Sequence, residues 1–111
     1  MKRYALALDL VDDEKLIAEY EAYHKAIWPE IEESIRSAGI LNMEIYRVAN
    51  RLFMVMEVAN DFSFEAKAKA DESNPKVQEW EALMWKYQQA LPTAKLGEKW
   101  LMMEKIFQLN S

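Results

Sequence analysis

Apolar and polar residues alternate at the start of the chain, over residues 4–10. The larger side chains fall at every second position, and Ala5, Ala7 and Asp9 occupy the positions between them. Strict alternation is typical of a β-strand, and small residues on one side indicate a close approach by another layer. We therefore expect the chain to begin with a strand that is covered on both faces.

The pattern then changes to a helical period. Asp13 is a good N-cap residue, and Gly39 is suited to the left-handed position that ends a helix. Pro29 removes a backbone donor between them, so the helix should kink or restart there. The apolar positions between the two signals have the spacing of one helix face: Leu16, Ile17, Tyr20, Tyr23, His24, Ile27, Trp28, Ile31 and Ile35.

Residues 40–48 and 52–58 are rich in β-forming side chains, and the short Ala49-Asn50-Arg51 connection between them predicts a β-hairpin. The remaining expected elements follow in chain order: a short helix from Asp61 to about Ala70, a helix over residues 77–91 that Pro92 ends, and a last strand over residues 100–109.

The order of elements is β-α-β-β-α-β over a single domain, residues 1–111. Short hairpins and right-handed crossovers turn this order into a ferredoxin-like α+β sandwich, with an antiparallel sheet and helices on one face. The strands carry more apolar residues than two helices can cover. An uncovered apolar sheet face predicts a partner, and a back-to-back homodimer, a dimeric α+β barrel, would bury it.

Composition narrows the possible chemistry. The chain has no Cys and one His, so it has neither a thiolate nucleophile nor a cysteine or multi-histidine metal site. Its 14 basic and 19 acidic residues give a net charge of −5, which argues against a nucleic-acid partner. The apolar runs are too short to cross a membrane. No signal peptide precedes the first strand pattern, so we expect a cytoplasmic protein.

His24 is the centre of the candidate chemistry. Tyr20, His24 and Trp28 are four residues apart and therefore share one helix face. A phenol, an imidazole and an indole in one row can hold a sugar, with the ring on an aromatic face and the hydroxyls on polar tips. A histidine can also move protons near neutral pH. The alternative is a buried histidine that has one hydrogen-bond partner and no catalytic role.

Other residues give weaker signals. Trp80, Met84 and Tyr87 form a similar row on the later helix, and packing is the simplest interpretation. The roles of Trp85, Glu44, Glu57 and Glu104 stay open at this point.

Residues 20–30 resemble the signature of the L-rhamnose mutarotase family, in which Tyr and His precede a Trp-Pro-Glu triplet. The matching residues are Tyr20, His24 and Trp28-Pro29-Glu30. Supporting matches run in order along essentially the whole chain: Gly39, Asn42, Tyr46, Leu52, Phe53, Gln78, Trp80, Ile106 and Phe107.

The resemblance implies an isomerase that interconverts the α and β anomers of a 6-deoxyhexose, in a dimeric α+β barrel, with no metal or cofactor. It makes His24 the catalytic acid, with Tyr20 beside it, Trp80 stacked on the sugar and Trp28 in the pocket wall. In the expected mechanism His24 protonates the ring oxygen O5 and reclaims that proton. The other proton transfer, at the O1 hydroxyl, is then made by Tyr20, Glu44 or a water.

Met43 and Tyr46 complete the expected substrate-binding residues. Rhamnose-specific relatives tend to carry a Tyr where this chain has Met43, and the lost phenol removes a hydrogen bond to a sugar hydroxyl. This difference counts against L-rhamnose, and residues 74–80 look more like those of family members that act on L-fucose. We therefore expect L-fucose as the substrate, with L-rhamnose next. The fold alone also suits a cofactor-free monooxygenase, a haem-binding barrel with His24 as axial ligand, or a non-enzymatic dimer that binds a small ligand.

Overall fold

The central strand of the sheet is β1 (Lys2–Leu10), in a computed structural model that describes residues 1–110. It pairs along most of its length with β3 (Arg51–Val58), and β2 (Ile40–Val48) lies beyond β3. Its other edge pairs with β4 (Gln88–Gln89) and β5 (Leu101–Met102). All pairs are antiparallel, and the order β2-β3-β1-β4 is that of the expected ferredoxin-like sheet.

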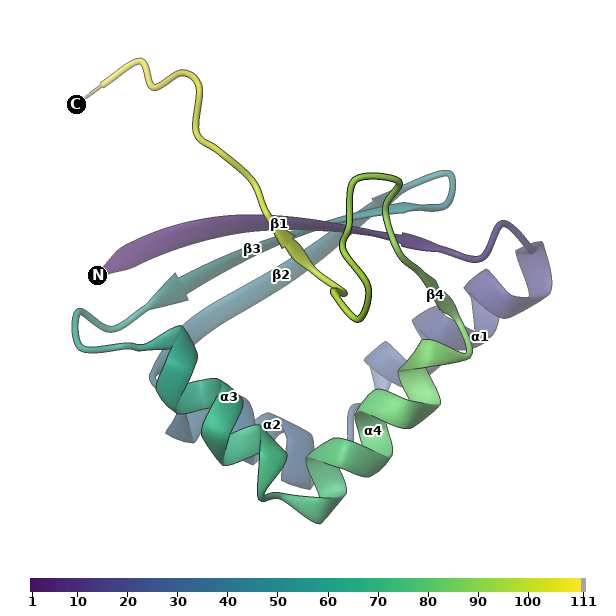
Figure 1. The fold of residues 1–111 in the computed structure, drawn as a ribbon, viewed down its shortest axis with the longest axis horizontal. Helices are drawn as coiled ribbons and strands as arrows, with labels where there is room; N and C mark the ends of the chain where they lie inside the picture. Colours follow the sequence, from purple (N-terminus) through teal and green to yellow (C-terminus); the bar gives the residue numbers. More distant parts are fainter. Residues whose placement is uncertain (111) are drawn as a thin grey trace.

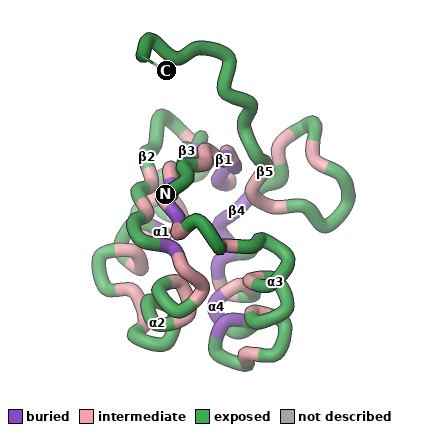
Figure 2. The backbone as a smooth tube through the Cα atoms, turned by 90° about the vertical axis from the view of Figure 1, so that its left-hand side faces the viewer, coloured by how far each residue is buried: buried purple, intermediate pink, exposed green. Residues whose placement is uncertain are grey.

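The helices of residues 1–110 lie on one face of this sheet, as Figures 1 and 2 show from two directions. The break at Pro29 is confirmed as a restart, because Pro29 is the first residue of a new helix and Trp28 is its N-cap. The helices are α1 (Glu14–Lys25), α2 (Pro29–Ser37), α3 (Phe64–Glu72) and α4 (Pro75–Trp85).

The predicted helix ends are partly right. The side chain of Asp13 accepts a hydrogen bond from the backbone N–H of Leu16, as expected of an N-cap. Gly39 has φ +94°, the left-handed conformation expected just beyond α2. The predicted cap of α3 was wrong, because the Ser63 side chain, and not Asp61, accepts from the N–H of Ala66.

The C-terminal third differs most from the expectation. The helix expected over residues 77–91 ends at Trp85, because Tyr87 turns into the core and Gln88 and Gln89 pair with β1. β4 and β5 follow one another along the same edge of β1, separated by a loop. The last strand, expected over residues 100–109, pairs only at residues 101–102, and the chain beyond it runs away from the sheet (Figure 1).

The core lies between the sheet and the helices. Side chains from alternate positions of β1 and β3 are buried on this face, and Trp80, Met84 and Tyr87 approach them from the α4 side. Within the described part of the chain no helix covers the opposite face (Figure 2), so β1 is covered there on one face only. Across that bare face, strand register aligns Tyr46, Phe53, Ala7 and Leu101 in one row. None of the helices within residues 1–110 is long and apolar enough to span a membrane.

Candidate active site

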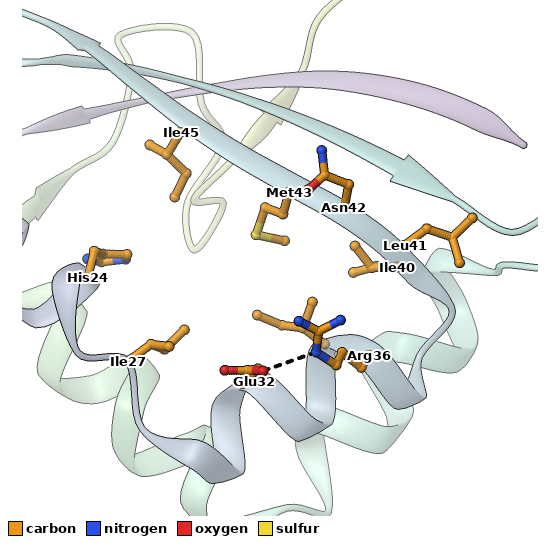
Figure 3. Close-up of a pocket in the computed structure, with 10 residues that line it drawn as sticks. His24, Ile27, Glu32, Arg36, Ile40, Leu41, Asn42, Met43 and Ile45 are labelled. Carbon is orange, nitrogen blue, oxygen red and sulfur yellow. Dashed lines mark hydrogen bonds and ion pairs between the residues drawn. The ribbon is translucent and has the colours of Figure 1, made fainter.

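A cavity of about 290 Å³ lies between the sheet and the helices. It adjoins a hollow that opens between β2 and α2, where Arg36 forms an ion pair with Glu32 at 3.1 Å (Figure 3). Four of the predicted site residues line the cavity, namely Tyr20 and His24 of α1, Met43 of β2 and Trp80 of α4. The fold therefore brings together side chains that are up to 60 positions apart in the sequence.

His24 enters the cavity from the last turn of α1, across from Met43 and Ile45 on β2 (Figure 3). Its Nδ1 lies 2.9 Å from the backbone oxygen of Tyr20. A carbonyl oxygen only accepts, so Nδ1 carries the hydrogen and Nε2 of the neutral ring keeps its lone pair. Burial lowers the pKa of His24, and the hydrogen bond to Tyr20 opposes this effect. The imidazole is therefore a neutral base at neutral pH.

Tyr20 lies against the imidazole, one helical turn earlier on α1. The two ring centroids are 4.4 Å apart, and Tyr20 is only 3% exposed. Its hydroxyl oxygen accepts a hydrogen bond from Nε2 of Gln88 at 3.4 Å, which leaves the hydroxyl hydrogen available to another acceptor. Burial raises the pKa of Tyr20, so the phenol stays protonated. The site thus holds a base and a weak acid side by side.

Trp80 closes the site on the α4 side. Its ring centroid is 5.6 Å from that of His24 and 5.0 Å from that of Trp28, with edge-to-face geometry in both pairs. Trp28 is not among the cavity-lining residues. It packs edge-on against Trp80, so the structure does not place Trp28 in the cavity wall, and its expected substrate-binding role stays a prediction.

Tyr46 does not join His24. It pairs with Phe53 on the bare face of the sheet and lines a separate hollow there with Glu44 and Glu57. Met43 and Tyr46 are three positions apart in one strand, so their side chains leave the sheet on opposite faces. Within one chain Tyr46 therefore cannot share a pocket with Met43.

The strand carboxylates also lie outside the cavity. Glu44 faces the same side as Tyr46, so it cannot serve the O1 hydroxyl of a sugar held by His24 in this chain. Glu57 forms an ion pair with Arg3 at 3.2 Å, and Glu104 is exposed beyond β5. Trp85 is exposed, with the Lys99 ammonium 4.7 Å from its ring centre. All four are accounted for without a role in the cavity.

Several cavity residues were not predicted. Gln88 was assigned to a helix, where its side chain had no defined partner, and only the early end of α4 brings it to the site. Trp100 had a weak signal as one of four tryptophans in a small chain. Lys67 and Asp71, an ion pair at 2.8 Å, carried the i,i+4 spacing of a helix pair. Among residues 1–110, no group of three or more acidic, His or Cys side chains is placed to hold a metal ion.

Comparison with known proteins assigns this chain to a family. The family model described as L-rhamnose mutarotase matches residues 3–109. The chain belongs to the L-rhamnose mutarotase family. It is 46% identical to the L-fucose mutarotase of Xanthomonas campestris pv. campestris, over 99% of this chain and 90% of that protein. It is 35% identical to the L-rhamnose mutarotase of Escherichia coli strain K12, over 62% of this chain and 61% of that protein.

A solved structure has the same fold. The crystal structure of an L-rhamnose mutarotase from Formosa agariphila matches with a TM-score of 0.72 and 21% identity, over 98% of this chain and 99% of that one. At this level of identity the likeness shows the fold. It confirms the α+β, ferredoxin-like architecture that the order of elements predicted.

Proposed function

We propose that this member of the L-rhamnose mutarotase family is an isomerase that interconverts the α and β anomers of a 6-deoxyhexose. The observation that carries the proposal is the pairing of His24 and Tyr20 in a cavity. His24 offers a neutral imidazole with a free Nε2, and Tyr20 offers a protonated phenol 4.4 Å away between ring centres. The identity of 46% with an L-fucose mutarotase over nearly the whole chain supports it.

Mutarotation requires two proton transfers at neighbouring oxygens. In ring opening, Nε2 of His24 takes the proton of the O1 hydroxyl, a C1–O1 double bond forms, and the C1–O5 bond breaks with its electron pair on O5. O5 receives a proton from the Tyr20 hydroxyl or from a water. After rotation about the C1–C2 bond, the same transfers run in reverse and close the ring as the other anomer.

This scheme exchanges the two roles expected from the sequence. There His24 was the acid at O5, whereas burial keeps the imidazole neutral and favours its action as a base at O1. The Tyr20 hydroxyl, with its hydrogen free, then faces O5. The reaction is slow but spontaneous in water, so positioning and modest acid–base assistance account for the catalysis.

The cavity wall suits a 6-deoxy sugar, and we favour L-fucose. Ile27, Ile35, Met43 and Ile45 give the cavity apolar surface that can accept the C6 methyl group. Met43 also lacks the hydroxyl that rhamnose-specific relatives tend to place at this position. The methyl group is common to L-fucose and L-rhamnose and so does not separate them. The missing hydroxyl, together with the likeness to the Xanthomonas protein, supports L-fucose as the better substrate and L-rhamnose as the next.

We also propose that the protein acts as a homodimer. The bare sheet face carries Phe53 and Tyr46 in exposed positions, and a second copy would cover it. Apolar side chains on the chain after β5 are exposed as well, and Ile106 is 93% exposed. An isologous partner would bury both surfaces at once.

The test is saturation-transfer NMR on the anomeric protons of L-fucose and L-rhamnose. We expect wild-type protein to accelerate exchange, more strongly for L-fucose, and His24→Gln to reduce that acceleration at least about a hundredfold, the usual worth of a general base. Lys25→Gln, an exposed neighbour on α1, is the matched control. Full activity in a folded His24→Gln variant would exclude the catalytic role of His24.

A further inference from the structure

Gln88 is a buried amide with an unused acceptor. The residue is 7% exposed and lines the same cavity as His24 and Tyr20. Its Nε2 donates to the Tyr20 hydroxyl, but Oε1 is buried and has no hydrogen-bond partner within residues 1–110. Such an atom costs folding stability, because water solvates it in the unfolded chain. Because Gln88 lines the cavity, a ligand bound there can supply the missing hydrogen.

The backbone holds Gln88 firmly in this position. Gln88 pairs with Leu10 of β1, and the backbone N–H of Val11 donates to the carbonyl of Tyr87 at 2.8 Å. Because α4 ends at Trp85, the Gln88 side chain is directed from a sheet edge and not from a helix. A group on a paired strand is placed more accurately than one on a free loop.

The order in which His24, Tyr20 and Gln88 contact one another indicates which part of the sugar Gln88 would contact. His24 touches Tyr20, and Tyr20 touches Gln88 on its other side. With O1 at His24 and O5 at Tyr20, the ring atoms beyond O5 are C5, which bears the methyl group, and C4, which bears a hydroxyl. The C4 hydroxyl is axial in L-fucose and equatorial in L-rhamnose, so a fixed acceptor at this place distinguishes the two sugars.

We propose that Gln88 is a substrate-binding residue that accepts a hydrogen bond from the C4 hydroxyl of the sugar and so contributes to the choice between L-fucose and L-rhamnose. This inference rests on the proposed mutarotase function. Gln88 moves no proton in the reaction. Its Oε1 binds substrate, while its Nε2 orients the phenol of Tyr20.

The experiment crosses variants of Gln88 with deoxy sugars. The variants are Gln88→Met, which keeps the length of the side chain, and Gln88→Leu, a second apolar replacement. Gln89→Met, the exposed neighbour on β4, is the matched control. The anomeric exchange efficiency, kcat/KM, is measured for L-fucose, 2-deoxy-L-fucose and 4-deoxy-L-fucose, and the melting temperature of each protein is measured in parallel.

We expect Gln88→Met to lower kcat/KM about tenfold more for L-fucose and 2-deoxy-L-fucose than for 4-deoxy-L-fucose, the effect of one lost hydrogen bond. Its melting temperature should stay equal or rise, because the variant removes an unsatisfied buried amide. A loss of the same size for all three sugars would assign Gln88 to the support of Tyr20 alone and overturn the proposal.

Other outcomes are equally decisive. If Gln88→Met and Gln89→Met both stay within about twofold of wild type for L-fucose, Gln88 does not bind the sugar. If the wild-type protein does not accelerate anomeric exchange of any of the three sugars, and does not accelerate that of L-rhamnose either, the mutarotase function itself is excluded. That result differs from one in which the wild-type protein is active and Gln88→Met shows no selective loss of activity on L-fucose, which would exclude only the proposal for Gln88.

Discussion

At the scale of residues, the decisive property of the site is the protonation state of His24. The imidazole lies against Tyr20 and Trp80, and this burial lowers its pKa below the ordinary value near 6.5. The hydrogen bond from Nδ1 to the Tyr20 carbonyl selects the tautomer with a basic Nε2. In the proposed mechanism this one histidine begins ring opening as a base.

The pH dependence of activity follows from this shift. We expect kcat/KM for L-fucose to be constant above about pH 6.5 and to fall as the pH passes below the lowered pKa, because imidazolium cannot take the O1 proton. The measurement is saturation-transfer NMR over a pH series, with the spontaneous exchange at each pH subtracted. A rate that rises on acidification would show that the imidazolium acts first, as an acid.

Stability should change with pH in the same direction. The unfolded chain binds a proton at His24 at a higher pH than the folded chain does, so acidification favours unfolding. The contribution is fully present above about pH 6.5 and is lost as the pH falls through the folded pKa. Urea unfolding of wild type and His24→Gln across this window measures it. Parallel curves for the two proteins would show that His24 contributes no such pH dependence.

At the scale of elements, α4 connects the stability of the fold to the site. Asn74 caps this helix, since its side chain accepts from the backbone N–H groups of Lys76 at 3.1 Å and Val77 at 3.3 Å. Trp80, one and a half turns later, packs against His24. The helix then ends at Trp85, which allows Gln88 to pair with β1 and face the cavity.

Removal of this cap should destabilise the protein, although Asn74 itself does not line the cavity. We expect Asn74→Ala to lower the free energy of unfolding by about 1 kcal/mol, the usual value of an N-cap side chain. Chemical denaturation followed by circular dichroism measures the change, and Asn110→Ala at the exposed end of the described chain is the control. Equal stability of Asn74→Ala and wild type would mean that water replaces the cap at no cost.

At the scale of the whole molecule, the main feature is the bare face of the sheet, opposite the helices. Aligned side chains on β2, β3, β1 and β5 present apolar area there, and the chain after β5 adds more. Exposed apolar side chains gathered on one face are typical of an interface. The proposed homodimer also brings Tyr46 and Glu44 into the buried part of the assembly.

The proposed homodimer can be tested by placing one charged side chain on the bare face of the sheet. We expect the wild-type protein to have twice the 13.1 kDa mass of one chain in sedimentation equilibrium. Phe53→Lys should shift the measured mass towards that of the monomer. In a two-fold dimer the substitution would bury an unpaired lysine from each chain in the interface. Leu96→Lys, on the exposed loop between β4 and β5, should leave the mass unchanged. A monomeric wild-type protein would exclude the homodimer.

The sequence alone determined the features that local chemistry dictates. Pro29 lacks a backbone donor and so restarts a helix, Gly39 adopts a left-handed φ, and a spacing of four brings Tyr20 and His24 together. These signals act within a few residues, and the order of the elements then leaves few possible topologies. The fold class and half of the site could be predicted for this reason.

The tertiary structure decided everything that depends on distant partners. The end of α4 is set by the free edge of β1, which pairs with Gln88 and Gln89 in place of further helical bonds. Tyr46 is excluded from the cavity because β3 fixes the register of β2. The neutral state of His24 depends on burial, to which Trp80 of α4 contributes. Local propensity carries no information about such contacts, because their energy comes from residues far away in the chain.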